Sequence, residues 1–253
     1  VTDEAERIAP NNPDVRLAMA RLHAARGQSV GARAIFEELV KVAPDNTTLR
    51  FELARVELRA RNFSVGKHVL ENLLVQDPSH LRARMALGEL AIRDGDFEQA
   101  KQIAAKVTEL HPGEASGLSL LGDTLLMSSD IAGATVAFSR ALEVKGNSSV
   151  VLKLFTAYRR AGDSAGGRKV LETWLEAHPD DGPVRLALAT SDHGTGEKDT
   201  ARSAYEGILE NAPNNFVALN NLAWLYFERG DERAVEFAKR AYDLAPRHPS
   251  IAD

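Results

Sequence analysis

Residues 81–114 read LRARMALGELAIRDGDFEQAKQIAAKVTELHPGE, and this stretch decides the fold. Apolar residues such as Leu87 and Ala91 recur at helical spacing in its first half. Gly95 can end that half in a left-handed conformation, and the aspartate that follows can cap a second helix. Pro112 prevents the second half from continuing as a helix. The stretch therefore predicts two helices joined by a tight turn.

The stretch is one of several similar repeats, because its closing proline recurs at fixed intervals. Pro44, Pro78 and Pro112 lie 34 residues apart, and Gly146 stands where the next proline would fall. The closing prolines are Pro10, Pro44, Pro78, Pro112, Pro179, Pro213 and Pro246. The turn residues near the middle of each repeat are Gly27, Asn62, Gly95, Asp130, Gly162, Gly196 and Gly230. A period of this length indicates a repeat architecture built from helical hairpins.

We divide the chain accordingly and expect one continuous superhelix over residues 1–253. The expected parts are a half-repeat over 1–12, repeats over 13–46, 47–80, 81–114, 115–147, 148–181, 182–215 and 216–248, and the start of a further repeat over 249–253. Arg61 and Asn62 replace the small turn residues of the second repeat, and Gly146 replaces a proline. The last repeat is one residue short after Gly230. We expect its second helix to start early or to pack with a shifted phase.

The repeats resemble the tetratricopeptide repeat, a helix-turn-helix unit with Leu-Gly, tyrosine, alanine, an aromatic residue and proline at set places. The repeat over 115–147 carries Leu121, Gly122, Ala134 and Phe138 at such places. The matches in the last full repeat are Leu222, Ala223, Tyr226, Gly230 and Pro246. The resemblance implies an all-α fold, a right-handed α-solenoid of about seven repeats. It also implies that the first helix of each repeat faces a concave surface that holds a protein or peptide.

The places that face this concave surface in the family give the candidate binding residues. We expect partner contacts from Arg21, Phe51, Arg55, Arg59, Arg82, Met85, Arg93, Asp123, Met127, Arg159, Asn220, Trp224 and Phe227. The first three repeats contribute five arginines to this set, although the chain has a net charge of −5. Because guanidinium groups bind carboxylates with two parallel donors, these five arginines predict an acidic partner. Alternatively, these arginines pair with acids on a neighbouring helix and keep the surface soluble.

The apolar candidates lie in later repeats than these arginines. Met127, Trp224 and Phe227 can anchor an apolar partner. Alternatively, a following repeat covers the two aromatic residues. The clamp for a terminal carboxylate that some relatives carry is not expected, because Leu186 and Thr190 occupy two of its places.

Composition excludes several classes of function. The chain has no cysteine, and with 31 Lys and Arg against 36 Asp and Glu it is not suited to broad nucleic-acid binding. No apolar run is long enough to cross a bilayer, so we expect no membrane contact. The segment HGTGEKDT at residues 193–200 lacks the spacing of a phosphate-binding loop, and no histidine pair suits a metal. We expect no enzyme activity, no cofactor and no metal.

The amino-acid sequence of residues 218–253 resembles the last repeats of bacterial envelope proteins that take part in exopolysaccharide export and PEP-CTERM sorting. That resemblance implies a scaffold in the periplasm or cell envelope, with the cytoplasm as the alternative. The alternative function is a regulatory or substrate-presenting segment of a larger enzyme, such as a glycosyltransferase. In that case a polysaccharide is the expected partner.

Overall fold

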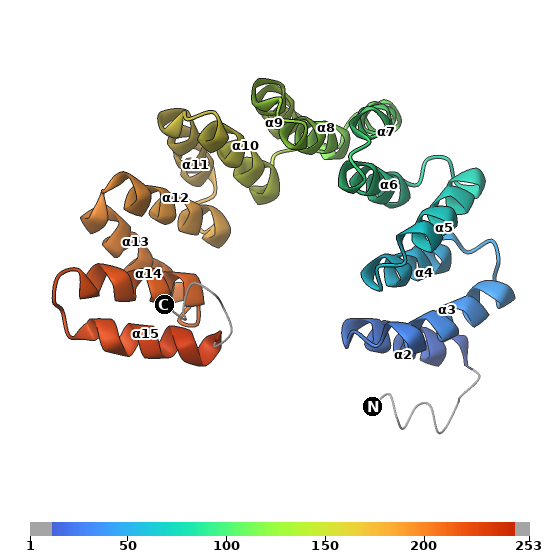
Figure 1. The fold of residues 1–253 in the computed structure, drawn as a ribbon, viewed down its shortest axis with the longest axis horizontal. Helices are drawn as coiled ribbons and strands as arrows, with labels where there is room; N and C mark the ends of the chain where they lie inside the picture. Colours follow the sequence, from blue (N-terminus) through green and yellow to red (C-terminus); the bar gives the residue numbers. More distant parts are fainter. Residues whose placement is uncertain (1–11, 246–253) are drawn as a thin grey trace. The chain divides into compact units, whose positions relative to one another are not determined.

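The computed structural model describes residues 12–245, which form fourteen α-helices and no strand (Figure 1). The first helices of the repeats are α2 (Pro13–Ala25), α4 (Thr47–Arg59), α6 (Leu81–Arg93), α8 (Ser116–Met127), α10 (Ser148–Arg160), α12 (Gly182–Thr195) and α14 (Phe216–Phe227). The second helices are α3 (Ser29–Val42), α5 (Phe63–Gln76), α7 (Phe97–Leu110), α9 (Ile131–Lys145), α11 (Ser164–Ala177), α13 (Lys198–Asn211) and α15 (Arg233–Leu244). The predicted all-α fold of helical hairpins is confirmed.

The chain divides into two compact units, residues 1–130 with helices α2–α8 and residues 131–253 with helices α9–α15. Within each unit every helix packs against the next one along the chain. First helices also touch across a repeat, as α6 touches α8 and α10 touches α12. One superhelix over 1–253 stays a prediction. The expected half-repeat over 1–12 lies, except for residue 12, outside the described residues, as does the further repeat over 249–253.

The hairpin turns depend on one left-handed residue each. Gly95 has φ +78°, and the other turn glycines, Gly27, Gly162, Gly196 and Gly230, are also left-handed. In the second and fourth repeats the left-handed residues are Arg61 (φ 62°) and Ser129 (φ 67°). Asn62 and Asp130, which the sequence marked as the turn residues, therefore follow the turn by one position. Side chains other than glycine lose about 1–2 kcal/mol in this conformation, so surrounding contacts must hold these two turns.

The last repeat is one residue short after Gly230, and the first turn of α15 is where that residue is missing. This helix begins three residues after Gly230, whereas α7 begins two residues after Gly95, so the expected early start is wrong. Asp231 caps the shortened end by accepting a hydrogen bond from the backbone N of Arg233 at 3.0 Å. The buried Ala234 is consequently the second residue of α15. The buried face keeps its contact because the first turn is shorter.

The core combines small residues with larger apolar ones from both helices of the repeats. In α7 the buried side chains are Ala104, Val107 and a further alanine, all at helical spacing. Small residues let the next first helix approach closely. A Cβ on Gly117 of α8 would lie 2.6 Å from the backbone N of Thr108 in α7. This helix pair in unit 1 therefore requires glycine at position 117.

Candidate functional site

A groove in unit 1 gathers five of the predicted residues. It runs along α4 and α6 and has a volume of about 410 Å³. The lining residues are Phe51, Arg55, Leu58, Arg59, Leu81, Arg82, Met85, Ala86, Glu89 and Ser116. They recur every three or four residues, which places them on one face of each helix. We call this site the unit 1 groove.

The three arginines of the unit 1 groove have different surroundings. The guanidinium of Arg82 lies over the ring of Phe51, with 4.3 Å from its carbon to the ring centroid. Arg55 donates from Nη1 to Glu52 Oε2 at 2.7 Å, within its own helix. Arg59 donates from Nη1 to the carbonyl of Ala24 at 3.4 Å. A guanidinium attracted to a ring in this way keeps its N–H donors for other partners.

Phe51 supports the groove more than it contacts a partner. It is 5% exposed and belongs to a core cluster with Ala54, Leu70 and Leu73. We expected a partner contact from Phe51 because its place in the repeat faces the concave surface in the family. In the folded chain the ring is covered by Arg82, so partner contact falls to the arginine.

Four other predicted residues of unit 1 lie outside the lining of this groove. Arg21 is exposed on α2, and Asp123 is half-buried on α8. Met127, at the end of α8, is largely exposed. Arg93 lies with its guanidinium carbon 3.4 Å from the ring centroid of Phe63. These residues do not join one site with Arg55, Arg59 and Arg82.

A second groove lies in unit 2 and has a volume of about 760 Å³. Its lining comes mainly from α10 and α12: Leu152, Phe155, Thr156, Arg159, Ser164, Pro183, Leu186, Ala187, Thr190, Ser191, Gly194, Thr195 and Val217. We call this site the unit 2 groove. Of the predicted residues, only Arg159 lines it. Phe155 offered a signal in the sequence, since it occupies the place where other repeats carry glycine or alanine, such as Gly88 and Ala189.

The remaining predicted residues lie on α14. Trp224 and Phe227 are exposed, and their rings meet edge to face with centroids 6.0 Å apart. Asn220 is half-buried on the same helix. The three do not line the unit 2 groove, to which α14 contributes Val217.

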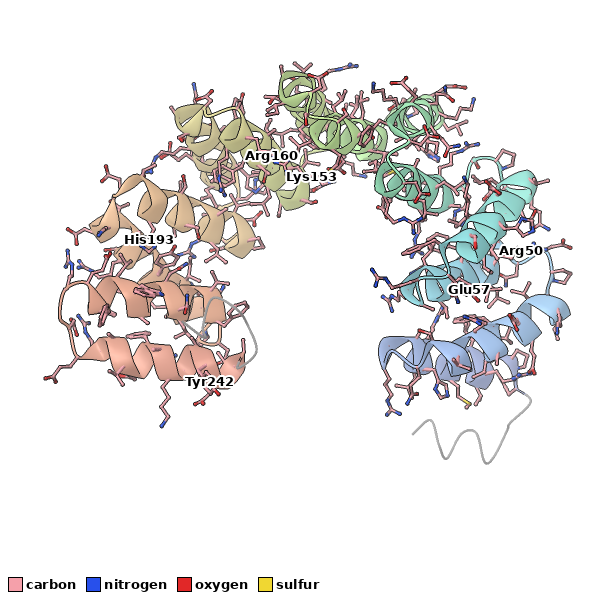
Figure 2. All side chains as sticks on the ribbon, in the orientation of Figure 1. Arg50, Glu57, Lys153, Arg160, His193 and Tyr242 are labelled. Carbon is pink, nitrogen blue, oxygen red and sulfur yellow. The ribbon has the colours of Figure 1, made fainter. Side chains whose placement is uncertain are left out.

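Ion pairs between a buried acid and a partly exposed arginine brace both units, and the repeat pattern did not predict them. Glu57 on α4 (Figure 2) is 2% exposed and lies 2.5 Å from Arg33 Nε. Asp192 on α12 is equally buried and pairs with Arg168 on α11. In each pair the arginine precedes the acid by 24 residues, and the acid stands where the repeat pattern has tyrosine. This spacing was the signal that could have found them.

The two pairs differ in their surroundings. Asn62 also donates from Nδ2 to Glu57 Oε2 at 2.7 Å. At Asp192, burial raises the pKa of the carboxyl above its ordinary value, and the guanidinium of Arg168 opposes that shift. Arg168 divides its donors, because it also bonds Glu172 at 2.7 Å.

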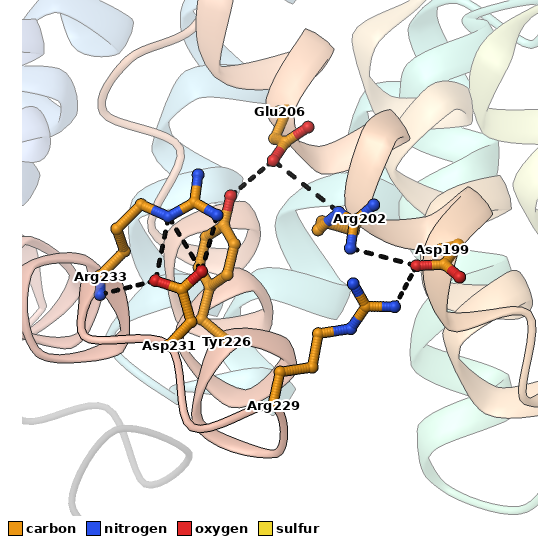
Figure 3. Close-up of polar contacts among 7 residues, drawn as sticks. All are labelled: Asp199, Arg202, Glu206, Tyr226, Arg229, Asp231 and Arg233. Atoms are coloured by element: carbon orange, nitrogen blue, oxygen red, sulfur yellow. Dashed lines mark hydrogen bonds and ion pairs between the residues drawn. The ribbon is translucent and has the colours of Figure 1, made fainter.

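A polar network fastens the last hairpin of unit 2 to α13 (Figure 3). Tyr226 donates its hydroxyl to Glu206 Oε1 at 2.5 Å, and burial raises the pKa of that phenol. Hydrogen bonds from Arg233 lower the pKa of the Asp231 carboxyl to about 2. The members of the network are Asp199, Arg202, Glu206, Tyr226, Arg229, Asp231 and Arg233.

Neither metal-binding nor membrane-spanning features are found in residues 12–245. In that part of the chain no three histidine or acidic side chains come close enough together to hold a metal ion. No described helix combines the length and the apolar character needed to cross a membrane.

Comparison with known families identifies the repeats. Tetratricopeptide repeat models match residues 51–115 and 152–215, residues 13–56, and residues 204–236. The chain therefore belongs to the tetratricopeptide repeat family. Members of this family are generally protein-interaction scaffolds, and none of these matches is to an enzyme family. No curated protein is similar enough to count as a relative.

Solved structures share the fold at low sequence identity. Yeast Tom70 has a TM-score of 0.79 at 15% identity over 98% of this chain and 54% of its own. A tetratricopeptide repeat protein from Parabacteroides merdae has a TM-score of 0.64 at 14% identity over 95% of this chain and 96% of its own. YrrB, described as having an unusual peptide-binding site, has a TM-score of 0.50 at 19% identity over 72% of this chain and 95% of its own. These likenesses confirm the α-solenoid fold.

Proposed function

We propose that the chain is a non-catalytic scaffold that binds peptide segments of partner proteins in its grooves. The observation that carries this proposal is the unit 1 groove, where Arg82 lies over Phe51 beside Arg55 and Arg59. A solenoid of hairpins presents extended surfaces of this kind to another chain. The solved structure of YrrB, whose description names a peptide-binding site, supports a peptide as the ligand.

The partner segment for the unit 1 groove is acidic. Three guanidinium groups lie along the groove, and the described acids near them are Glu52, which pairs with Arg55, and Glu89. The excess of positive charge favours carboxylates, which accept the paired donors of a guanidinium. The alternative role of these arginines, in which they pair with acids on a neighbouring helix, is not what Arg55 does, since Glu52 lies on its own helix.

We place the scaffold in the bacterial cell envelope, in exopolysaccharide or protein export and sorting. The support is the resemblance of residues 218–253 to the last repeats of such proteins. Fractionation of cells that express the full-length protein tests the compartment. Recovery with the cytoplasm would contradict the envelope assignment and leave peptide binding to be judged separately.

Affinity capture tests the proposed binding function. The wild-type chain and the variant Arg55→Ala, Arg59→Ala and Arg82→Ala serve as baits in an envelope extract, and bound proteins and glycans are both identified. The control variant changes the same charge outside both grooves, at Arg26→Ala, Lys41→Ala and Arg140→Ala, which are all exposed. We expect an acidic protein to be captured by wild type and control and lost from the groove variant.

Two other results would overturn this proposal. Capture of glycan in place of protein favours the segment of a larger enzyme. Equal capture by all three baits would show that the three arginines keep the surface soluble and do not bind the partner. A circular dichroism melt of each variant shows whether the fold is kept, as we expect for exposed or half-buried arginines on helix surfaces.

A further inference from the structure

The unit 2 groove has an apolar floor. Leu152 and Phe155 come from α10, Leu186 and Ala187 from α12, and Val217 from α14. These side chains recur at helical spacing on facing helices, so the floor continues along the groove. Its volume of about 760 Å³ is in the size range of ligand sites, although the groove is open on one side. The floor therefore suits aliphatic side chains.

The threonine hydroxyls on the wall of the groove already donate their protons to backbone carbonyls of α10 and α12. Thr156 donates from Oγ1 to the carbonyl of Leu152 at 2.8 Å, and Thr190 donates to that of Leu186 at 2.8 Å. Thr195 shows the same bond to the carbonyl four residues earlier, at 3.2 Å. A hydroxyl has one proton and two lone pairs. Thr190 Oγ1 already accepts a hydrogen bond from the hydroxyl of Tyr205 at 3.3 Å and keeps one lone pair, so each of these oxygens meets a ligand as an acceptor. These three threonines consequently pair with donors of whatever binds.

An extended peptide supplies such donors and a helix does not. The backbone N–H groups of a helix bond to its own carbonyls, whereas those of an extended strand point outward at regular intervals. Carboxylates and phosphates carry acceptors only and gain nothing from these threonines. The preference differs from that of the unit 1 groove, where guanidinium donors line the wall.

The length and charge of the groove define the ligand further. Its lining on α12 runs from Pro183 to Thr195, a distance of about 18 Å for a helix. An extended chain covers this with about five residues. Arg159 is the charged residue of the lining, and no Asp, Glu or Lys joins it among the residues that the structure places there. One acidic side chain at the end where α10 finishes complements that charge.

We infer that the unit 2 groove binds an extended peptide segment of about five residues, with aliphatic side chains on the floor and one acidic side chain at Arg159. The inference rests on the proposed function, because both take a peptide as ligand. It assigns to unit 2 a site whose chemistry differs from that of unit 1. An experiment can therefore contradict the proposal for one groove and leave the proposal for the other intact.

Fluorescence anisotropy with a labelled, end-capped heptapeptide library tests the inference. The library carries leucine, isoleucine or valine at alternate places, serine between them and one aspartate near the end. We expect binding that is lost when the peptide N–H groups facing the wall are methylated. We also expect Thr156→Val with Thr190→Val to weaken binding about tenfold, since two hydrogen bonds are removed with little change of shape.

The matched control is Thr135→Val, which removes a hydroxyl with the same internal bond, at 2.9 Å, but outside the groove. Arg159→Gln should lower the affinity for the peptide that carries aspartate. The affinity should then equal that for the same peptide with asparagine in place of the aspartate. Absence of binding by the whole library, equal binding of the methylated peptides, or preference for a helical peptide or a glucan oligosaccharide would each overturn the inference. If the acidic peptides still bind unit 1 and are lost from its arginine variant, the proposed function stands while this inference fails.

Discussion

The two grooves occupy the same places of the repeat and differ in chemistry. At the ninth place of the first helices unit 1 has Arg55 and Glu89, whereas unit 2 has Thr156 and Thr190. These side chains lie on the face opposite the helix packing, so they can change without disturbing the core. This scaffold therefore uses different residue positions for folding and for recognition.

The largest effect is expected where a helix packs most tightly against a glycine. Gly117 of α8 meets α7 between two hairpins of unit 1, whereas Gly167 of α11 meets α10 within one hairpin of unit 2. Gly117→Ala should lower the free energy of unfolding by about 2 kcal/mol, since the new Cβ meets backbone in α7. Gly167→Ala in unit 2 should cost less, because the new Cβ would meet only side chains, at 3.2 Å from Phe155. Urea unfolding measures both.

Gly113→Ala is the control for this pair, as no atom lies within 4 Å of its Cβ position. Its stability should stay near that of the wild type. Equal losses at positions 117 and 167 would show that these two helix contacts tolerate a Cβ equally, against the expectation.

A transfer of charge between the grooves should have the next largest effect. In the variant that lacks Arg55, Arg59 and Arg82, we add Thr156→Arg and measure a labelled acidic peptide by anisotropy. Affinity should rise about tenfold through new guanidinium contacts. It should fall again at about 0.5 M salt, where charges are screened within a few ångströms. No gain would mean that position 156 does not set the chemistry of its groove.

The buried pair of unit 2 should show a smaller effect that depends on pH. Because the pKa of Asp192 is raised, its neutral form is favoured by folding, and this contribution to stability is lost as pH rises through the folded pKa. Asp192→Asn should therefore gain stability relative to the wild type as pH increases from about 3 to 7. Denaturant titrations across that range measure the difference, and a difference that falls with pH would contradict it.

The smallest expected effect is local to the last hairpin. Arg233→Gln should raise the pKa of Asp231 from about 2 toward its ordinary value, because hydrogen bonds from Arg233 lower it. NMR titration of the carboxyl reports this change, with Arg240→Gln as the control. The stability linked to Asp231 exists above the unfolded pKa and is lost as pH falls through about 2. An unchanged pKa would assign the shift to another neighbour.

The sequence predicted the hairpins well and the grooves only in part. Prolines and turn glycines act locally, so their spacing predicts helices before any contact is known. Register placed Arg55, Arg59 and Arg82 on one surface, and the structure brings them together. Burial of Phe51 and the lining by Phe155 depend on neighbouring helices, which a repeat pattern does not contain.

The buried ion pairs bear on how the repeats find their order during folding. Similar hairpins can dock on the wrong neighbour, and repeat proteins misassemble in this way. An arginine on α3 is matched by Glu57 of α4, and Arg168 of α11 by Asp192 of α12. A misplaced hairpin would bury one of these acids without a partner, which costs several kcal/mol. The pairs thus favour correct docking of α4 on α3 and of α12 on α11 over arrangements that leave the acid without its arginine.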